Sequence, residues 1–172
     1  PWRRFFARAV DVCTAGLMLF VLFIYAFNAT MPEQAADLAV AIQNPIVASI
    51  ALYLVWLPAE ALLLSLFGTT PAKWLFGIRV VHTSGDLLSF SKALNRSLLV
   101  FVHGVGLGIP FVALLTHLFA YRRLTKTGTT LWDASASAVV LHKKWGVFRG
   151  LTCTAAVLAV TILISALNAA GK

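Results

Sequence analysis

Two acidic residues border long apolar segments of this chain, where a carboxylate requires a compensating partner. Asp11 follows Arg8 by three residues, and residues 12–32 then contain no charged side chain. Residues three apart share one face of a helix, so Arg8 and Asp11 can pair. Glu60 lies within a second apolar segment and has no basic residue within helical reach. Because an unpaired charge in a membrane span costs about 2.5–3.5 kcal/mol, these acids mark candidate functional positions.

The depth of the two acids suggests a shared site. Counted at 1.5 Å per residue, Asp11 and Glu60 each lie roughly 10 Å from the same end of their helices. Carboxylates that meet in a dry environment cannot all ionise easily, so one of them can hold a proton and exchange it for a cation. We therefore take Asp11 and Glu60, with Asp133 and Arg8, as candidates for an ion or proton site.

A structural role is the alternative for the same residues. Arg8 with Asp11, and Asp133 with Arg96 or Arg122, would then form ion pairs that fasten loops to helices. His103 lies in a third apolar segment, where it could relay a proton or simply make a packing hydrogen bond. No metal ligand set and no cofactor motif is expected.

The elements that position these residues are transmembrane helices. The chain has 172 residues, of which 60% are hydrophobic and 12% charged, whereas soluble domains have about 25% charged residues. Four segments without charge are long enough to cross a bilayer: residues 12–32, 38–59, 97–121 and 150–171. The net charge is +8, and the basic residues flank these segments. Anionic lipid is therefore a more suitable partner than nucleic acid.

The distribution of Lys and Arg predicts the topology. Basic residues precede the first apolar segment and are absent from the loop that follows it, which places the N-terminus in the cytoplasm. A third segment that crossed fully would carry the basic residues after 121 to the outside, against this rule. Its centre, residues 103–110, contains three glycines and a proline. We expect either a re-entrant pair of half-helices or one helix kinked at Pro110.

The loop between the second and third segments should contain local structure. Pro71 begins a short amphipathic stretch that we interpret as an interfacial helix. Residues 78–81 and 87–90 flank a turn cluster and predict a short cytoplasmic β-hairpin, and residues 136–141 predict a further strand that pairs with it. The expected fold is an all-α membrane protein, a single domain over residues 1–172, with three transmembrane helices and the broken third segment.

Three motifs in this order resemble the RDD family of small membrane proteins. They are Arg8 with Asp11, the stretch 68–81, and Trp132-Asp133 ahead of 138–141. The chain departs from the usual family pattern at Ala72, commonly glycine, and at Trp132, often histidine. The resemblance implies a multi-pass protein of a bacterial inner membrane. It also implies transport, with sodium/proton antiport in one branch of the family.

Three functions follow as hypotheses. The first is a cation/proton transporter that uses the intramembrane carboxylates and works as a homo-oligomer. The second is a non-enzymatic adaptor that binds a partner protein or anionic lipid through its basic cytoplasmic face. An enzyme is the least favoured, because the chain has no H-E-x-x-H, nucleophile elbow or Walker motif.

Overall fold

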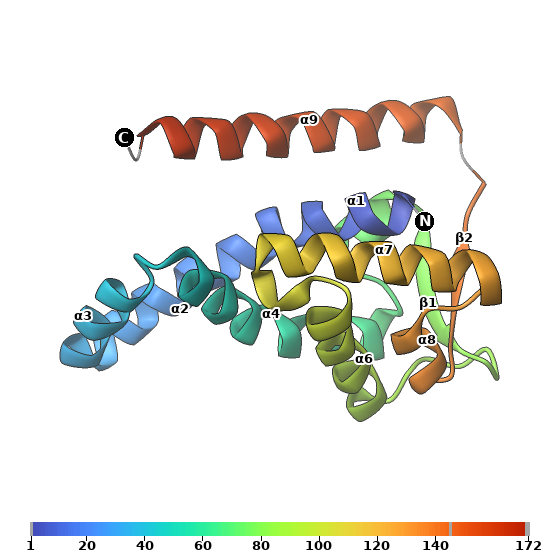
Figure 1. Ribbon diagram of the computed structural model, residues 1–172, viewed down its shortest axis with the longest axis horizontal. Helices are drawn as coiled ribbons and strands as arrows, with labels where there is room; N and C mark the ends of the chain where they lie inside the picture. Colours follow the sequence, from blue (N-terminus) through green and yellow to red (C-terminus); the bar gives the residue numbers. More distant parts are fainter. Residues whose placement is uncertain (1, 145, 171–172) are drawn as a thin grey trace.

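The computed structural model describes the backbone of residues 2–144 and 146–170, and the side chains of these ranges except 110, 147–149, 163 and 167–170. The described chain is mostly helical and has one two-stranded sheet at one end of the molecule (Figure 1). The prediction of a mostly helical chain is confirmed, whereas the predicted number of membrane spans stays a prediction.

The first membrane-length helix runs without interruption from Trp2 to Thr30. It consists of α1 (Trp2–Asp11), a π-helical turn (Val12–Gly16) and α2 (Leu17–Thr30). A π-turn widens a helix locally and changes the direction in which neighbouring side chains point. Here it begins directly after Asp11. Helix α3 (Pro32–Ala41) then folds back along α2 at the far end of the molecule (Figure 1).

Helix α4 (Pro45–Phe67) is the second helix long and apolar enough to cross a membrane. It begins where the Asn44 side chain accepts hydrogen bonds from the N–H groups of Ile46 and Val47. It ends at Gly68, which has a left-handed backbone with φ +69°, a conformation that glycine adopts without steric cost. The last helix, α9 (Val147–Ala170), contains the apolar segment Gly150–Ala166, and its role as a third span stays a prediction.

The third apolar segment is broken, as predicted. Helix α6 (Phe90–His103) and helix α7 (Pro110–Thr127) are separated by a single 3₁₀ turn, Gly106–Gly108. Gly106 and Gly108 have φ values of +62° and +77°, and a Cβ atom on Gly106 would lie 2.5 Å from the Ala113 nitrogen. The backbone therefore requires glycine here. After the break α7 runs back toward the sheet (Figure 1).

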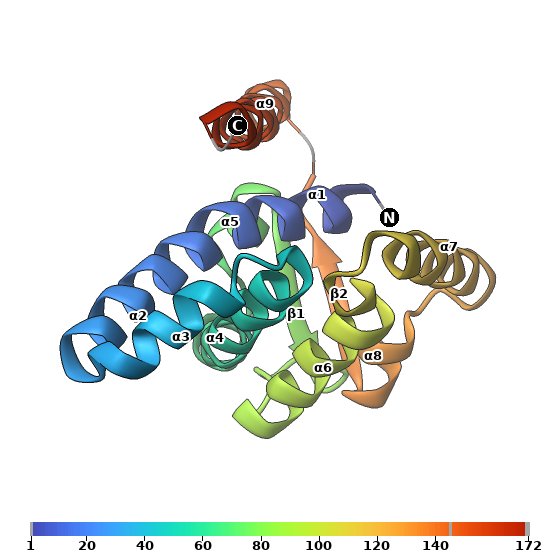
Figure 2. The same ribbon diagram turned by 60° about the vertical axis from the view of Figure 1, so that its left-hand side comes forward.

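The sheet pairs segments that are distant in sequence. Strand β1 (Ile78–His82) lies antiparallel to β2 (Ala138–His142), with Val80 opposite Val140 at the centre. The predicted partnership with the 136–141 region is confirmed with slightly shifted bounds. Figure 2 shows both strands behind α1, with α6 and α8 (Leu131–Ser135) beside β2.

The predicted hairpin with residues 87–90 is wrong. After β1 the chain makes a single turn, in which the His82 N–H donates to the Asp86 carbonyl at 2.8 Å. Ser89 then accepts a hydrogen bond from the Lys92 N–H and caps α6, while Leu88 is buried in the core. Capping and burial of this segment leave β1 free to pair with β2.

The two strands belong to an internal repeat of 60 residues. Gly68-Thr69-Thr70 and Gly128-Thr129-Thr130 each end a long helix and precede a five-residue helix. These short helices are α5 (Pro71–Leu75) and α8, and each leads into one of the strands. Between short helix and strand, Gly77 and Ser137 both have positive φ, +64° and +49°. The strand register relates the repeats by a twofold axis through the Val80–Val140 pair.

Helix α5 differs from the predicted interfacial helix in one respect. Trp74 is exposed, as expected of an interfacial ring, but Lys73 is buried. The charge of Lys73 therefore faces the interior of the protein, where the carboxylates lie.

Candidate functional site

Asp11 is almost completely enclosed, with 1% of its surface exposed. Its carboxylate faces the first turn of α5, where it accepts hydrogen bonds from the Thr70 hydroxyl and from the Ala72 N–H at 2.8 Å. Asp11 thus caps α5 from another helix, because the side chain of Thr70, the N-cap residue of α5, makes no capping hydrogen bond. Negative charge is stabilised at a helix N-terminus.

Lys73 joins Asp11 to Glu60. Its Nζ donates to Glu60 Oε1 at 2.7 Å and lies 3.5 Å from Asp11 Oδ2, and it also donates to the Thr70 hydroxyl at 3.2 Å. All three ionic side chains are buried. We call this group (Asp11, Glu60, Lys73 and Thr70) the lysine-bridged cluster. The prediction that Asp11 and Glu60 lie close together agrees with this geometry, but their common partner was not foreseen.

The predicted pairing of Arg8 with Asp11 is wrong. The ion pair that Asp11 makes within the described residues is with Lys73. Asp11 turns toward the N–H groups of α5, whereas Arg8 turns the other way and lies over the ring of Trp132, with its Cζ 5.6 Å from the ring centroid. A cation over an indole face is itself a favourable contact.

Asp133 forms a second buried cluster with two arginines. Its Oδ2 accepts from Arg4 Nη1 at 2.8 Å, and its Oδ1 accepts from Arg96 Nε at 2.9 Å. Burial alone would raise the pKa of Asp133, but the charges of Arg96 and Arg4 outweigh burial and hold this pKa below its ordinary value. Of the two predicted partners Arg96 is present, whereas Arg122 lies on the exposed surface of α7. Arg4 was not foreseen.

The two clusters are built around equivalent positions of the repeat, but the residues at these positions have opposite charges. Lys73 and Asp133 occupy equivalent positions, 60 residues apart, in α5 and α8. Helix α1 supplies a counter-charge to each: Asp11 to Lys73, and Arg4 to Asp133. Helices α4 and α6 supply the others, Glu60 and Arg96. One face of α1 therefore fastens both short helices. The repeated Gly-Thr-Thr is the sequence signal that could have revealed this relationship.

Within the described residues, neither histidine of the third segment forms a hydrogen bond or an ion pair with a member of either cluster. His103 is exposed at the end of α6. His117 bonds through Nδ1 to the Ala113 carbonyl at 2.6 Å and contacts the ring of Phe5. The hydrogen bond of His117 fits the packing alternative, and the role of His103 stays a prediction.

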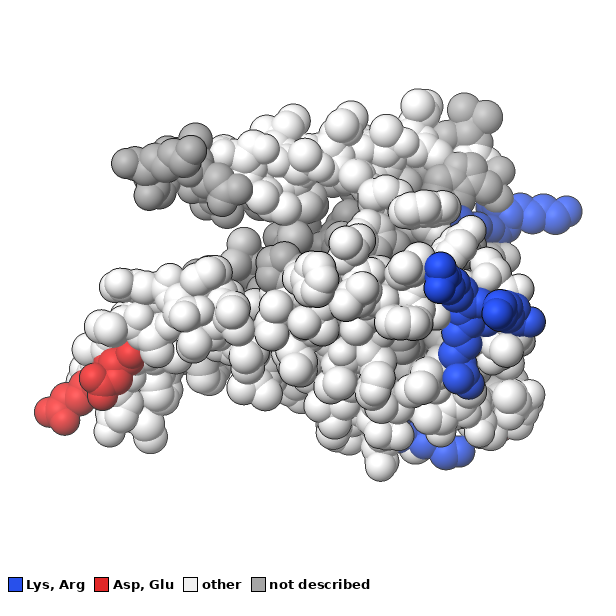
Figure 3. Space-filling view, viewed as in Figure 1, with Lys and Arg blue, Asp and Glu red and all other residues white. Residues whose placement is uncertain are grey.

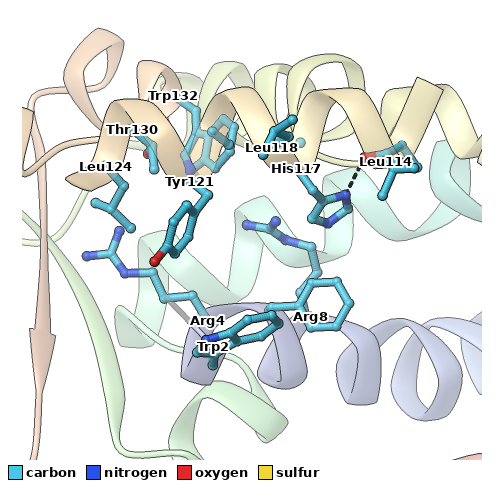
Figure 4. Close-up of a pocket in the computed structure, with 14 residues that line it drawn as sticks. Trp2, Arg4, Arg8, Leu114, His117, Leu118, Tyr121, Leu124, Thr130 and Trp132 are labelled. Atoms are coloured by element: carbon cyan, nitrogen blue, oxygen red, sulfur yellow. Dashed lines mark hydrogen bonds between the residues drawn. The ribbon is translucent and has the colours of Figure 1, made fainter. Parts of the chain in front are cut away.

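A groove opens between α1 and α7, with a volume of about 630 Å³. Its walls are mainly apolar, and Arg4 and Arg8 reach into it from α1 (Figure 4). Tyr121 and His117 project into it from α7, and Trp132 lines it from α8. The groove adjoins the Asp133 cluster through Arg4. Its lining includes Thr130, the repeat equivalent of Thr70, but no member of the lysine-bridged cluster.

Two apolar helices of membrane length, with buried ion pairs that join them to the short helices α5 and α8, indicate a helical membrane protein. The model of the RDD family matches residues 1–137, and the chain belongs to this family. Comparison with curated proteins and with solved structures gave no match.

Proposed function

We propose that the protein exchanges a monovalent cation for a proton across the membrane, and that the lysine-bridged cluster is the exchange site. The observation that carries the proposal is the single ammonium group shared by carboxylates from two membrane helices. Lys73 Nζ occupies the place between Glu60 and Asp11 that a bound cation would take. Lysine, unlike arginine, can lose its proton when buried.

The exchange balances in charge. When a cation such as Na⁺ binds between the carboxylates, Lys73 releases one proton and becomes a neutral amine. The bound cation then replaces the ammonium charge, so the buried charge is the same before and after. Carboxylate and hydroxyl oxygens are suitable ligands for such a hard cation, and the Thr70 hydroxyl already lies beside both Asp11 and Lys73.

The family resemblance and the charge distribution support this proposal. Intramembrane acids commonly mark ion and proton pathways. The acidic residues Glu33 and Asp37 lie exposed at the α3 end, and exposed basic residues gather at the opposite, sheet end (Figure 3). By the positive-inside rule the sheet end faces the cytoplasm, so the cluster lies toward the cytoplasmic side of the membrane.

Proton flux in proteoliposomes tests the proposal. An inward Na⁺ gradient should drive proton export that a pH-sensitive dye records, and choline in place of Na⁺ should not. Lys73→Arg keeps the ion pairs but cannot release a proton, so we expect a folded protein whose Na⁺-driven flux falls at least about tenfold. Asp37→Asn, at the far end of the molecule, is the matched control and should retain flux. Flux that is equal in Lys73→Arg and wild type would refute the proposal, as would flux no greater than in empty liposomes.

A further inference from the structure

The Arg8 side chain is the starting point for an inference about a second site. Its Nε is buried, and within the described residues no acceptor bonds to it and no carboxylate lies within ion-pair distance of the guanidinium. A buried donor without an acceptor is costly. The stacking of Arg8 over Trp132 leaves the edge of its guanidinium directed toward the groove (Figure 4).

The charges around the groove do not cancel. The two clusters and Arg8 together contain three carboxylates (Asp11, Glu60 and Asp133) and four cationic groups (Arg4, Arg8, Lys73 and Arg96). One positive charge is in excess, and the residues that line the groove include Arg4 and Arg8 but no carboxylate. A monoanion in the groove would balance the excess.

The walls of the groove specify what kind of anion fits. The groove is lined by Phe5 of α1 and by Leu114 and Leu118 of α7. Helix α7 also has the exposed apolar side chains Phe111 and Phe119. Exposed apolar side chains of this kind suit contact with acyl chains. Trp2 and Tyr121, whose rings suit the boundary between lipid and water, lie beside the two arginines (Figure 4).

We infer that the groove between α1 and α7 binds one anionic phospholipid, with its phosphodiester against Arg8 and Arg4 and its acyl chains along α7. Arginine donors in a fork suit phosphate oxygens, and the volume is in the range of ligand pockets. A free phosphate would meet the charge but leave the apolar walls uncovered. This site is separate from the exchange site and does not depend on transport.

Lipid retention by the full chain in neutral detergent tests the inference. Phosphatidylglycerol or phosphatidylcholine is added, bound lipid is counted by native mass spectrometry, and thermal stability is followed in parallel. Phosphatidylglycerol should be retained about tenfold more strongly than phosphatidylcholine, and inorganic phosphate at equal concentration should not stabilise the protein.

Two variants and a control locate the site. Arg8→Gln should reduce phosphatidylglycerol retention about tenfold. Ala120→Trp, which fills the groove from α7 without removing a charge, should do the same and serves if Arg8→Gln does not fold. Arg123→Gln removes an exposed cation of α7 outside the groove and should change retention less than about twofold. Equal retention by wild type, Arg8→Gln and Ala120→Trp would overturn the inference. So would an equal loss in Arg123→Gln, or stabilisation by inorganic phosphate alone.

Discussion

Lys73 and Asp133 occupy the same position in two copies of one structural unit and carry opposite charges. Each is buried, and each binds one residue of α1 and one residue of another long helix. The opposite charges require opposite partners, which explains why α1 presents both Arg4 and Asp11 on the side that meets the short helices. The same helix thereby positions the proposed exchange site and the arginines of the groove.

The lysine-bridged cluster should be strongly coupled in stability. Lys73→Met leaves Asp11 and Glu60 buried without their ammonium partner, and we expect a loss of about 3–5 kcal/mol in the free energy of unfolding. Adding Glu60→Gln to Lys73→Met should recover part of this loss, because one uncompensated charge is removed. Denaturant unfolding in detergent of the wild type, the two single variants and the double variant gives the double-mutant cycle. Losses that simply add would show that Lys73 and Glu60 do not interact.

The Asp133 cluster predicts a dependence of stability on pH. The pKa of Asp133 is lower in the folded protein than its ordinary value of 3.8. The unfolded chain therefore takes up the proton first as the pH falls. The contribution of Asp133 is fully present above about pH 4 and declines below it, toward the folded pKa.

A comparison of variants isolates this contribution. The stability difference between wild type and Asp133→Asn, measured by thermal unfolding from pH 7 to pH 2.5, should be largest at neutral pH and should shrink in acid. A difference that stays constant over this range would contradict the assigned ion pairs. Arg4→Gln should cost less than Arg96→Gln, because the Arg4 side chain is 21% exposed and that of Arg96 is 3% exposed.

The repeat makes a prediction about backbone strain. Ser137 adopts the left-handed conformation that Gly77 adopts at the equivalent position. Left-handed backbone costs a residue with a Cβ about 1–2 kcal/mol. Ser137→Gly should therefore leave stability unchanged or raise it by up to about 1 kcal/mol, whereas Gly77→Ser should lower it. Thermal unfolding of both variants decides this, and a clear destabilisation by Ser137→Gly would count against the equivalence of the two positions.

The return of the third apolar segment predicts which residues share one side of the membrane. In a background without Cys13 and Cys153, a cysteine at position 127 should react with a thiol reagent only from the side where the sheet lies, together with a cysteine at position 84. A cysteine at position 33 should react only from the other side. Labelling in sealed, oriented vesicles provides the readout. Opposite labelling of positions 127 and 84 would show that the segment crosses the bilayer fully.

Much of the architecture could be predicted from patterns of apolar and charged residues. The long apolar helices, the break at the glycines and the pairing of 78–82 with 138–142 all follow from local composition and from the charge rule. The proximity of Asp11 and Glu60 followed from their matched depth. The position of Lys73 did not, because a lysine in a short amphipathic stretch normally faces water.

The other errors have a similar origin. The hairpin prediction favoured the neighbour in sequence, whereas the burial of Leu88 and the cap at Ser89 use that segment to begin α6. The pairing of Arg8 with Asp11 followed helical spacing, which does not foresee the contacts of the carboxylate with Thr70, the Ala72 N–H and Lys73. Tertiary contacts decided both cases. The repeated Gly-Thr-Thr indicates that Lys73 and Asp133 occupy equivalent positions, and this symmetry could have predicted their partners.

Proton release on cation binding tests the central proposal most directly. Na⁺ is added to the purified protein in weakly buffered detergent solution, and a pH indicator counts the protons released. The exchange at Lys73 predicts about one proton per chain in wild type and none in Lys73→Arg. Na⁺ binding without proton release, or the same release in Lys73→Arg as in wild type, would contradict the exchange of a cation for the Lys73 proton.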